Sequence, residues 1–419
     1  MNKRENAILL PRLRFPEFHL TGGWDRCTLE KVADRITEKV GDKQLTTFSI
    51  SAGVGFVSQA EKFNRDISGK QYKNYINLKK GDFSYNKGNS KKFPQGCIYE
   101  LEEYEEAAVP NAFISFRFRA SYVSNFYKGY FDNNFHGKQL AKFITSGARM
   151  DGLLNICPSD FFSIVLPTPK EKEEQQKIAD CLSSIDDLIH AESKKLSALK
   201  DHKKGLMQKL FPAMDRTVPE WRFSEFRHCG DWILDTIGKT CASYSGGTPA
   251  TSEKEYYSGN IPFIRSGEID KETTELCLSK EGFERSSAKM VSVGDILVAL
   301  YGANSGEVAL SRINGAINQA ILCLKHKTNN AFVYHYLTHK KNWIIRTYIQ
   351  GGQGNLSGEI IKSIELFFPS ELNEQKKIAD CLSSIDELIS MQAEKIEALK
   401  THKKGLLQGL FPSIEEVSE

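Results

Sequence analysis

The residues of this chain that are best suited to chemistry lie in Gly-rich loops with Asn, Gln, Lys, Arg and Tyr side chains. These loops are GDFSYNKGNSKK (81–92), TSGARMDGLLN (145–155), YSGGTPATSEKEYYSGNIPFIRSG (244–267), GDILVALYGANSG (294–306) and GGQGNLSGE (351–359). Arg and Lys can donate to O6 and N7 of guanine, and Asn and Gln can pair with N6 and N7 of adenine. Lys, Ser and Tyr can hold phosphates. The residue types therefore predict contact with nucleic acid.

Polar side chains in these loops and in the adjoining strands are the candidates for DNA contact. In the first half of the chain they are Asn86, Lys87, Lys91, Lys92, Arg117, Arg119, Lys138 and Arg149. In the second half they are Tyr256, Tyr257, Arg265, Asn304, Asn318, Gln319, Gln353 and Asn355. For a single residue, turn formation or solvation is the commoner role, and at least half of protein–DNA hydrogen bonds go to the sugar–phosphate backbone. The run Lys340, Lys341 and Arg346 is expected to be a solvated helix face.

The sequence lacks the motifs with which an enzyme would act on nucleic acid. It has no G-x-x-x-x-G-K-[ST] phosphate loop for ATP hydrolysis, no Asn-Pro-Pro-aromatic tetrapeptide of an amino-methyltransferase, and no H-E-x-x-H or G-x-S-x-G motif. His136 and His202 stand alone and are expected to be surface or satisfied residues rather than catalytic bases. We therefore predict a binding protein without a catalytic site, a metal or a cofactor of its own.

The composition is typical of a globular protein. The chain has 419 residues, 40% of them hydrophobic and 26% charged, and its formal net charge of +3 excludes a polycationic chain without identifying a partner. Its 9 cysteines form no C-x-x-C pair, so we expect free thiols in a reducing cytosol, with neither disulfides nor zinc. No apolar run approaches the roughly 20 residues that cross a bilayer, and residues 1–10 are too short a stretch for a signal peptide. A cytoplasmic protein that does not bind membranes is predicted.

The polar loops belong to a chain that repeats itself. Residues 174–186 read EQQKIADCLSSID, and residues 374–386 read EQKKIADCLSSID. When residues 173–212 are compared with residues 373–412, 27 of the 40 aligned positions are identical. A period of 200 residues indicates two large halves rather than a solenoid, whose repeats are roughly 20–50 residues long.

A fainter repeat, with an offset of 208, relates residues 11–24 to residues 219–232. The stretches between the repeated segments, about 25–165 and 233–367, show no mutual resemblance in sequence. They have short β-rich runs separated by Gly, Asn and Ser turns, which is typical of mixed α and β structure. The chain thus alternates between a variable module and a shared segment, twice.

Each shared segment has apolar residues at alternating intervals of four and three, the a and d pattern of a coiled coil. The first stripe is Ile178, Leu182, Ile185, Ile189, Leu196, Leu199, Leu206 and Leu210. The second is Ile378, Leu382, Ile385, Ile389, Ile396, Leu399, Leu406 and Leu410. Glu192 and Lys203 interrupt the first stripe, and Gln392 and Lys403 interrupt the second. These polar residues either fix the register or lie solvated, with the lysine stems over apolar surface.

Each predicted helix ends at a proline, Pro212 or Pro412, which cannot continue an α-helix. The simplest arrangement packs the two helices antiparallel, with a variable module at each end, so that the pair acts as a rigid spacer. Leu188 and Leu388 widen the apolar stripe for another packing partner.

The predicted fold class is α+β. Two mixed α/β modules are joined by two long α-helices that pack as an antiparallel coiled coil, and the whole has a pseudo-twofold, cyclic internal repeat. The expected domains are the modules at residues 1–165 and 216–367 and the helical segments at residues 166–215 and 368–419.

In this order, the segments resemble the specificity subunit of type I restriction–modification enzymes. The resemblance rests on RFPEF…GGW (14–24), RFSEF…GDW (222–232), GGTPATSEKEYYSGNIPFI (246–264), GDFSYNKGNS, GDILVALYGANSG, INQAI (317–321), and LPTPKEKEEQQKIADCLSSIDDLI (166–189) with its C-terminal copy. It covers nearly the whole chain, and the ordered set is much more specific than any single motif.

The resemblance implies a non-catalytic guide for methylation and cleavage of DNA. Each variable module would be a target-recognition domain for one half of a split, asymmetric site in double-stranded DNA. The helical pair would set the gap between the half-sites and dock two methyltransferase subunits, which use S-adenosylmethionine to modify adenine N6. Two restriction subunits would add translocation and cleavage that depend on ATP and Mg²⁺. The base-contacting residues vary within the family, so the resemblance does not assign them.

Two alternative hypotheses explain part of the sequence. A methyltransferase fused to its own specificity domain would bind S-adenosylmethionine, but the cofactor and catalytic motifs are missing. A coiled-coil scaffold that binds only protein explains the helices but not two large, dissimilar modules on near-identical helices. Binding of labelled S-adenosylmethionine would test the first hypothesis, and salt-dependent DNA binding would test the second.

Overall fold

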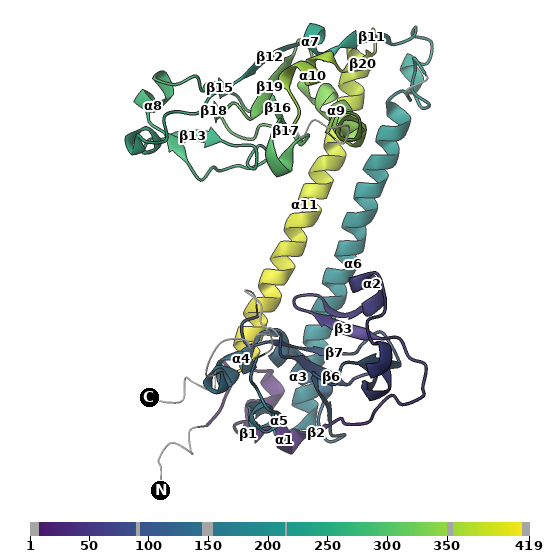
Figure 1. The fold of residues 1–419 in the computed structure, drawn as a ribbon, viewed down its shortest axis with the longest axis vertical. Helices are drawn as coiled ribbons and strands as arrows, with labels where there is room; N and C mark the ends of the chain where they lie inside the picture. Colours follow the sequence, from purple (N-terminus) through teal and green to yellow (C-terminus); the bar gives the residue numbers. More distant parts are fainter. Residues whose placement is uncertain (1–7, 89–92, 145–153, 214–215, 350–354, 413–419) are drawn as a thin grey trace. The chain divides into compact units, whose positions relative to one another are not determined.

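The computed structural model describes residues 8–88, 93–144, 154–213, 216–349 and 355–412 (Figure 1). The chain forms two compact units. Unit 1 comprises residues 1–191 and 395–419, and unit 2 comprises residues 192–394. Each long helix contributes to both units, so unit 1 is discontinuous in sequence.

Unit 1 is built on a four-stranded antiparallel sheet with the strand order β2-β9-β6-β7. Its strands are β2 (Ala33–Arg35), β9 (Ile114–Phe118), β6 (Phe83–Asn86) and β7 (Cys97–Glu100). Strand β9 buries Phe116 and Phe118 and exposes Arg117 between them, because successive side chains of a strand point to opposite faces. The helix α3 (Ser124–Asp132) covers the apolar face, where the ring of Tyr127 stacks on Phe118 with centroids 4.3 Å apart.

Unit 2 contains an equivalent four-stranded antiparallel sheet, with the strand order β12-β19-β16-β17. Its strands are β12 (Cys241–Ser245), β19 (Ile321–His326), β16 (Ile296–Ala299) and β17 (Val308–Leu310). Ala33 faces Phe118 in unit 1 and Cys241 faces His326 in unit 2, so both strands of this pair are displaced by 208 residues. The helix α9 (Asn330–Ile344) packs against one face. The two modules, which show no sequence resemblance, therefore each contain a core sheet of the same topology.

A second repeated element is a small antiparallel sheet of two strands. In unit 1, β1 (Asp25–Thr28) pairs with β10 (Val165–Thr168), and in unit 2, β11 (Ile233–Thr236) pairs with β20 (Glu365–Phe368). Four short helices flank these strands: α1 (Leu29–Val32), α5 (Pro158–Phe162), α7 (Ile237–Thr240) and α10 (Gly358–Ser363). The first strands are again 208 residues apart, and the second strands 200, so the sheet joins the two sequence repeats.

The units differ in what is added to this frame. Unit 1 adds two antiparallel pairs of strands, with the helices α2 (Gln59–Phe63) and α4 (Phe135–Leu140). The pairs are β3 (Phe48–Ser51) with β4 (Gly55–Ser58), and β5 (Ile76–Lys79) with β8 (Glu106–Val109). Unit 2 adds the helix α8 (Lys280–Glu284) and a mixed sheet in which β13 and β18 are parallel. Its strands, in spatial order, are β14 (Cys277–Leu278), β13 (Ile261–Ile264), β18 (Gly315–Ile317) and β15 (Lys289–Val291).

The long helices α6 (Lys172–Leu210) and α11 (Leu372–Leu410) are 39 residues each. In unit 1, Lys403 near the end of α11 pairs with Asp186 near the start of α6 (Nζ–Oδ1 2.7 Å). In unit 2, Lys203 of α6 pairs with Asp386 of α11 (2.6 Å). These crossed pairs make the helices antiparallel, as can be followed in Figure 1. The predicted α+β fold with an antiparallel helical pair is confirmed. No helix in the described part of the chain is long and apolar enough to cross a membrane.

Every apolar residue of the two predicted stripes is buried or half-buried. The polar residues that interrupt the stripes have partners across the helical pair. Gln392 donates through Nε2 to Oε2 of Glu192 at 2.6 Å, and both lysines bind aspartates, as described above. Paired polar groups of this kind suit register setting, because a shifted register would leave them without partners. Leu188 and Leu388 are 43% and 50% exposed and lie outside the seam.

Candidate nucleic-acid interface

The Gly-Asp dipeptide positions the central strand of the core sheet in both units. Gly81 and Gly294 adopt positive φ angles of 86° and 87°, which glycine tolerates without strain. The carboxylates that follow accept backbone bonds within the same turn: Asp82 from the amide of Lys79 at 2.6 Å, and Asp295 from that of Ser292 at 2.8 Å. The turn fixes where the strand starts, and therefore where the polar loop after it begins.

At the other end of the central strand, a second polar loop joins the first. In unit 1 the amide of Leu154 donates to the carbonyl of Lys87 at 2.9 Å, and in unit 2 that of Leu356 donates to the carbonyl of Leu300 at 3.0 Å. Lys87 and Leu300 are both the sixth residue after the glycine of the Gly-Asp turn. In each unit, two polar loops that are far apart in sequence therefore meet, and the meeting point is the same in both units relative to the Gly-Asp turn.

In unit 2, four segments meet at this point: residues 246–248, 300–304, 318–320 and 355–356. We call them the four-segment cluster. Besides the bond between Leu356 and Leu300, Leu300 donates to the carbonyl of Ala320 at 2.8 Å, and Gly246 donates to that of Asn318 at 3.2 Å. The cluster contains four of the predicted contact residues, which are Asn304, Asn318, Gln319 and Asn355. Gln319 and Asn355 are exposed, and Asn304 and Asn318 are half-buried.

Several candidates have structural roles of their own. Asn86 donates to the carbonyl of Ile50 at 3.1 Å and accepts from the amide of Gly88 at 2.9 Å, so it shapes the start of its loop. Tyr257 donates to the carbonyl of Pro249 at 2.7 Å, outside the four-segment cluster. Tyr256 is half-buried beside the helix α8, and Lys138 is exposed on the helix α4. Lys91, Lys92, Arg149 and Gln353 lie outside the described residues.

The three candidate arginines in the described part of the chain are held in ion pairs. Arg117 donates to both oxygens of buried Asp82 at 2.5 and 2.7 Å, and these bonds raise the pKa of Arg117. Lys325 pairs with Asp295 at the equivalent place in unit 2. Arg119 binds Asp34, and Arg265 binds Glu268 and Glu275. These arginines share their charge with carboxylates, which favours a structural role; contact with DNA stays a prediction for them.

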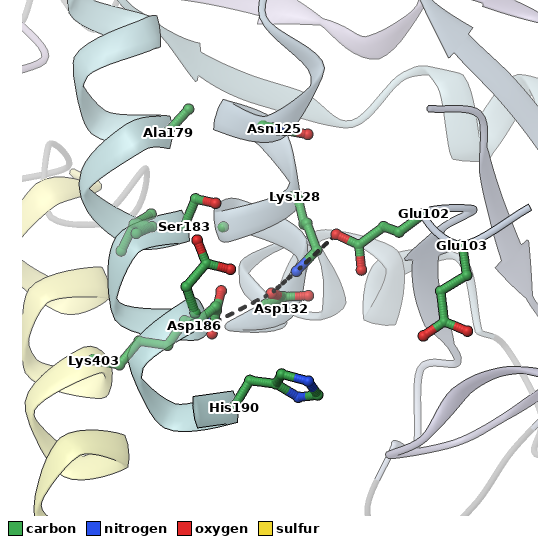
Figure 2. Close-up of a pocket in the computed structure, with 13 residues that line it drawn as sticks. Glu102, Glu103, Asn125, Lys128, Asp132, Ala179, Ser183, Asp186, His190 and Lys403 are labelled. Atoms are coloured by element: carbon green, nitrogen blue, oxygen red, sulfur yellow. Dashed lines mark hydrogen bonds and ion pairs between the residues drawn. The ribbon is translucent and has the colours of Figure 1, made fainter. Parts of the chain in front are cut away.

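An acidic pocket in unit 1 contrasts with these loops (Figure 2). It is lined by Glu102, Glu103, Lys128, Asp132, Asp186, Asp187, His190 and Lys403, among others. Its two lysines are already paired, Lys128 with Asp132 at 3.1 Å and Lys403 with Asp186 at 2.7 Å. The remaining carboxylates would repel a phosphate backbone. This pocket, between α3 and the helical pair, is therefore unsuited to DNA.

Two buried ion pairs that the sequence analysis missed join the helices to the repeated Arg-Phe motif. Arg14 donates to both oxygens of Glu174 at 2.7 and 2.8 Å, and Arg222 donates to both oxygens of Glu374 at 2.7 Å. Both glutamates are almost fully buried. In unit 1 the indole of Trp24 also donates to Glu174. The signal was present in the sequence, because each partner belongs to one of the two repeats.

No group of three or more His, Cys, Asp or Glu side chains that could hold a metal ion is found among the described residues. The described cysteines are free, and Cys27, Cys97, Cys241 and Cys323 are buried. Burial raises the pKa of Cys97, Cys241 and Cys323 to about 11. These buried thiols have the character of packing residues rather than of reactive groups.

Comparison with known proteins accounts for this arrangement. A family model described as "Type I restriction modification DNA specificity domain" matches residues 231–401. A protein of Methanocaldococcus jannaschii assigned as the specificity subunit of the type I restriction enzyme MjaX is 27% identical over 297 residues, which cover 69% of this chain and 68% of that protein. In both comparisons the chain is similar to the specificity subunits of type I restriction–modification enzymes. The MjaVIII specificity subunit of the same organism is 26% identical over 287 residues, which cover 64% of this chain and 66% of that protein.

Solved structures show the same fold over nearly the whole of this chain. The S subunit of a type I restriction–modification system from M. genitalium aligns over 96% of this chain and 99% of its own, with a TM-score of 0.63 at 15% identity. A chain from a structural study of complex assembly and conformational transition in the type I system aligns over 93% and 98%, with a TM-score of 0.53 at 15% identity. At this level of identity, the likeness establishes the fold and leaves the contact residues open.

Proposed function

We propose that this specificity subunit reads a bipartite, asymmetric site in double-stranded DNA, one half with the variable module of each unit. The observation that supports this most directly is the repeated loop junction. Both units bring two polar loops together at the end of the same central strand, but the residues there differ. Lys87 and Gly88 stand in unit 1 where Leu300 and Tyr301 stand in unit 2. Equivalent core sheets with different loop residues are suited to the recognition of two different DNA half-sites.

The chain acts as a guide in this proposal, and its partner subunits do the chemistry. Two methyltransferase subunits use S-adenosylmethionine to methylate adenine N6, and two restriction subunits use ATP and Mg²⁺ to translocate and cleave DNA in the cytoplasm. The match of residues 231–401 to a type I restriction–modification specificity domain supports this division of labour, and so does a sequence without phosphate-loop or methyltransferase motifs.

The paired helices serve two purposes in the proposal: they set the gap between the half-sites and dock the methyltransferase subunits. Leu188 and Leu388 lie at equivalent positions in the near-identical stretches, and both are substantially exposed although they are apolar. Two near-identical surfaces suit two copies of one partner. Exposed leucines beside a coiled-coil seam provide apolar area for further helices to bury.

The proposal is tested by measuring DNA binding of the chain together with its methyltransferase subunits. Fluorescence anisotropy with a labelled duplex should show one preferred sequence, and the affinity should fall steeply between about 50 and 200 mM salt, because phosphate contacts release counterions. The isolated chain should bind no labelled S-adenosylmethionine. Binding that ignores DNA sequence would contradict the proposal, and so would cofactor binding by the chain alone.

A further inference from the structure

An equivalent turn leads into the last strand of the core sheet in both units. In unit 2 it covers residues 318–321 and is closed by a bond from the amide of Ile321 to the carbonyl of Asn318 at 3.4 Å. In unit 1 it covers residues 110–113 and is closed by a bond from Phe113 to Pro110 at 3.1 Å. Strand β19 follows the first turn and strand β9 follows the second.

The strand register establishes which residues of the two turns correspond. Val298 and Tyr85 are both the fourth residue after the glycine of the Gly-Asp turn, and they face Leu322 and Ile114 in the neighbouring strand. Counting back three residues from these partners gives Gln319 in unit 2 and Asn111 in unit 1. Both are exposed primary amides. The frame therefore presents an amide side chain at the same place in both units.

In unit 2 this amide is held in one orientation. The hydroxyl of Thr248 donates to Oε1 of Gln319 at 2.6 Å. Thr248 reaches it because the backbone at Gly246 approaches the turn so closely that a Cβ there would lie 1.8 Å from the carbonyl oxygen of Ile317. With Oε1 engaged, Gln319 presents the two N–H donors of Nε2, for which the described residues contain no acceptor.

Thr248 occupies one of the two acceptor sites of Oε1, so the groups that Gln319 leaves free are mainly donors, which match a partner that only accepts. Phosphate oxygens are such acceptors, and neutral side chains and backbone amides commonly hold them in protein–DNA complexes. An amide that reads adenine needs its oxygen as well as its nitrogen. The four-segment cluster around Gln319 contains no charged residue, and it exposes Tyr301 (40%) and Asn355 as further neutral polar groups.

We propose that Gln319, positioned by Thr248, donates a hydrogen bond to a phosphate oxygen of the DNA backbone and so places unit 2 on the duplex, and that Asn111 makes the equivalent contact in unit 1. This inference rests on the proposed DNA-reading function and adds the class of contact. Thr248 is a positioning residue, since it acts through the amide that it orients. No side chain in the described part of unit 1 holds Asn111 in this way, and Val40, which stands 208 residues before Thr248, has no hydroxyl.

The test uses the full chain with its methyltransferase subunits and two duplexes, one with the methylated site and one with a scrambled sequence. Gln319→Ala should weaken binding to both duplexes by about three- to tenfold, the usual range for one hydrogen bond. The slope of log affinity against log salt should stay unchanged, because no cation is removed. Thr248→Val should weaken binding less, and it should have no effect once Gln319 is alanine. Asn111→Ala should give the same uniform loss as Gln319→Ala.

Thr274→Val is the matched control, because its hydroxyl also bonds within unit 2, to the carbonyl of Leu276 at 2.7 Å, but outside the cluster. It should bind DNA like the unchanged protein, and thermal unfolding should show that all variants are folded. Unchanged affinity of Gln319→Ala would overturn the inference. So would a loss confined to one base pair of the site, which would make Gln319 a base reader. If the unchanged complex preferred no sequence, the proposed function itself would fail.

Discussion

The two units of this protein have the same core sheet and the same ion pair to a long helix, and they differ in the loops and additional sheets that these support. The four-stranded core sheets have the same strand order and the same register, yet the strands FSYN and ILVA that occupy their centres have no residue in common. The shared features are those that geometry requires: a Gly-Asp turn before the central strand, and a buried arginine–glutamate pair at the start of each long helix. Outside the frame, unit 1 builds two-stranded sheets and unit 2 a mixed sheet of four strands. The same core sheet can therefore support loops of different sequence and structure.

Exchange of one variable module should have the largest effect, and it should change the DNA sequence that only one unit recognises. Replacing residues 25–165 with the corresponding module of another family member should change one half of the methylated site and leave the other half and the gap intact. Each mismatched base pair costs about 1–3 kcal/mol, so binding to the original half-site should fall by orders of magnitude. Sequencing of methylated adenines measures the outcome. If both halves of the site changed, the units would not be independent readers.

Charges in the helical seam should have the next largest effect, and it should be felt in both units. Leu199 is a half-buried seam residue of unit 2, and Leu399 is its counterpart in unit 1. Changing both to aspartate buries two carboxylates without partners and should cost roughly 2–4 kcal/mol each. Circular dichroism during chemical denaturation would show the loss. Lys204→Ala, at an exposed helix position, is the control and should change little. Full stability of the double variant would show that the seam is not a core.

Removal of the buried ion pairs should affect the stability of the two units to different extents, because the two pairs have similar but not identical surroundings. Glu174→Ala and Glu374→Ala each leave a buried arginine without its carboxylate, which should cost about 3–5 kcal/mol of stability. The loss should be greater for Glu174→Ala, since Trp24 also donates to Glu174 at 3.1 Å, whereas the indole nitrogen of Trp232 has no partner among the described residues. Hydrogen exchange at the start of α6 and α11 would locate each loss in its own unit. Equal losses would mean that the tryptophan bond adds nothing.

The helical pair and the polar loops could be predicted from the sequence. The two repeated segments indicated two similar helices, which must bury similar apolar stripes. The heptad stripes predicted the antiparallel helices because buried seam positions must recur every three or four residues. The polar loops were found from composition, and their meeting at Lys87 and Leu300 follows from the strand that both loops flank. The shared core sheet could not be predicted, because the same strand has two different patterns: FSYN alternates apolar and polar residues, whereas ILVA is apolar and buried throughout.

The roles of single polar residues were less accessible to sequence analysis. Arg117 looked like a DNA contact but is engaged by Asp82, and Arg265 is engaged by Glu268 and Glu275. Asp82 is 35 residues from Arg117 in sequence, and the register of β6 and β9 brings the two into contact, whereas Glu268 and Glu275 are 3 and 10 residues from Arg265. Thr248 was overlooked because its role depends on a close backbone approach across 71 residues. Ion pairs and clamps of this kind follow from folding, so composition alone does not reveal them.

Two lysines should separate phosphate contacts from sequence reading in unit 1. Lys91→Ala with Lys92→Ala should weaken binding to all sequences alike, because lysine contacts phosphates as a point charge. The slope of log affinity against log salt should become shallower by roughly one to two units, since each lost phosphate contact removes about 0.9. Lys170→Ala, an exposed lysine next to the long helix, is the control and should leave the slope unchanged. A loss confined to the preferred sequence would make these lysines base readers.

The two units should also differ in how their stability depends on pH. Burial, reinforced by Glu102, raises the pKa of Glu100 to about 8, whereas Leu310 occupies the equivalent strand position in unit 2. Between the ordinary pKa of 4.5 and about 8, the folded chain holds a proton that the unfolded chain lacks. Stability of unit 1 should therefore fall as the pH rises from about 5 to 8. Glu100→Gln should remove this dependence in thermal unfolding, and a Leu310→Val control should retain it.

The measurement that tests the central account most directly is a genome-wide map of methylated adenines in cells with and without this chain. If the two units read two half-sites, one bipartite and asymmetric motif should be methylated in the first cells and unmethylated in the second. Its two specific halves should be separated by a fixed number of unread base pairs. An unchanged map, or the loss of one short uninterrupted motif, would contradict the account of two readers on a shared frame.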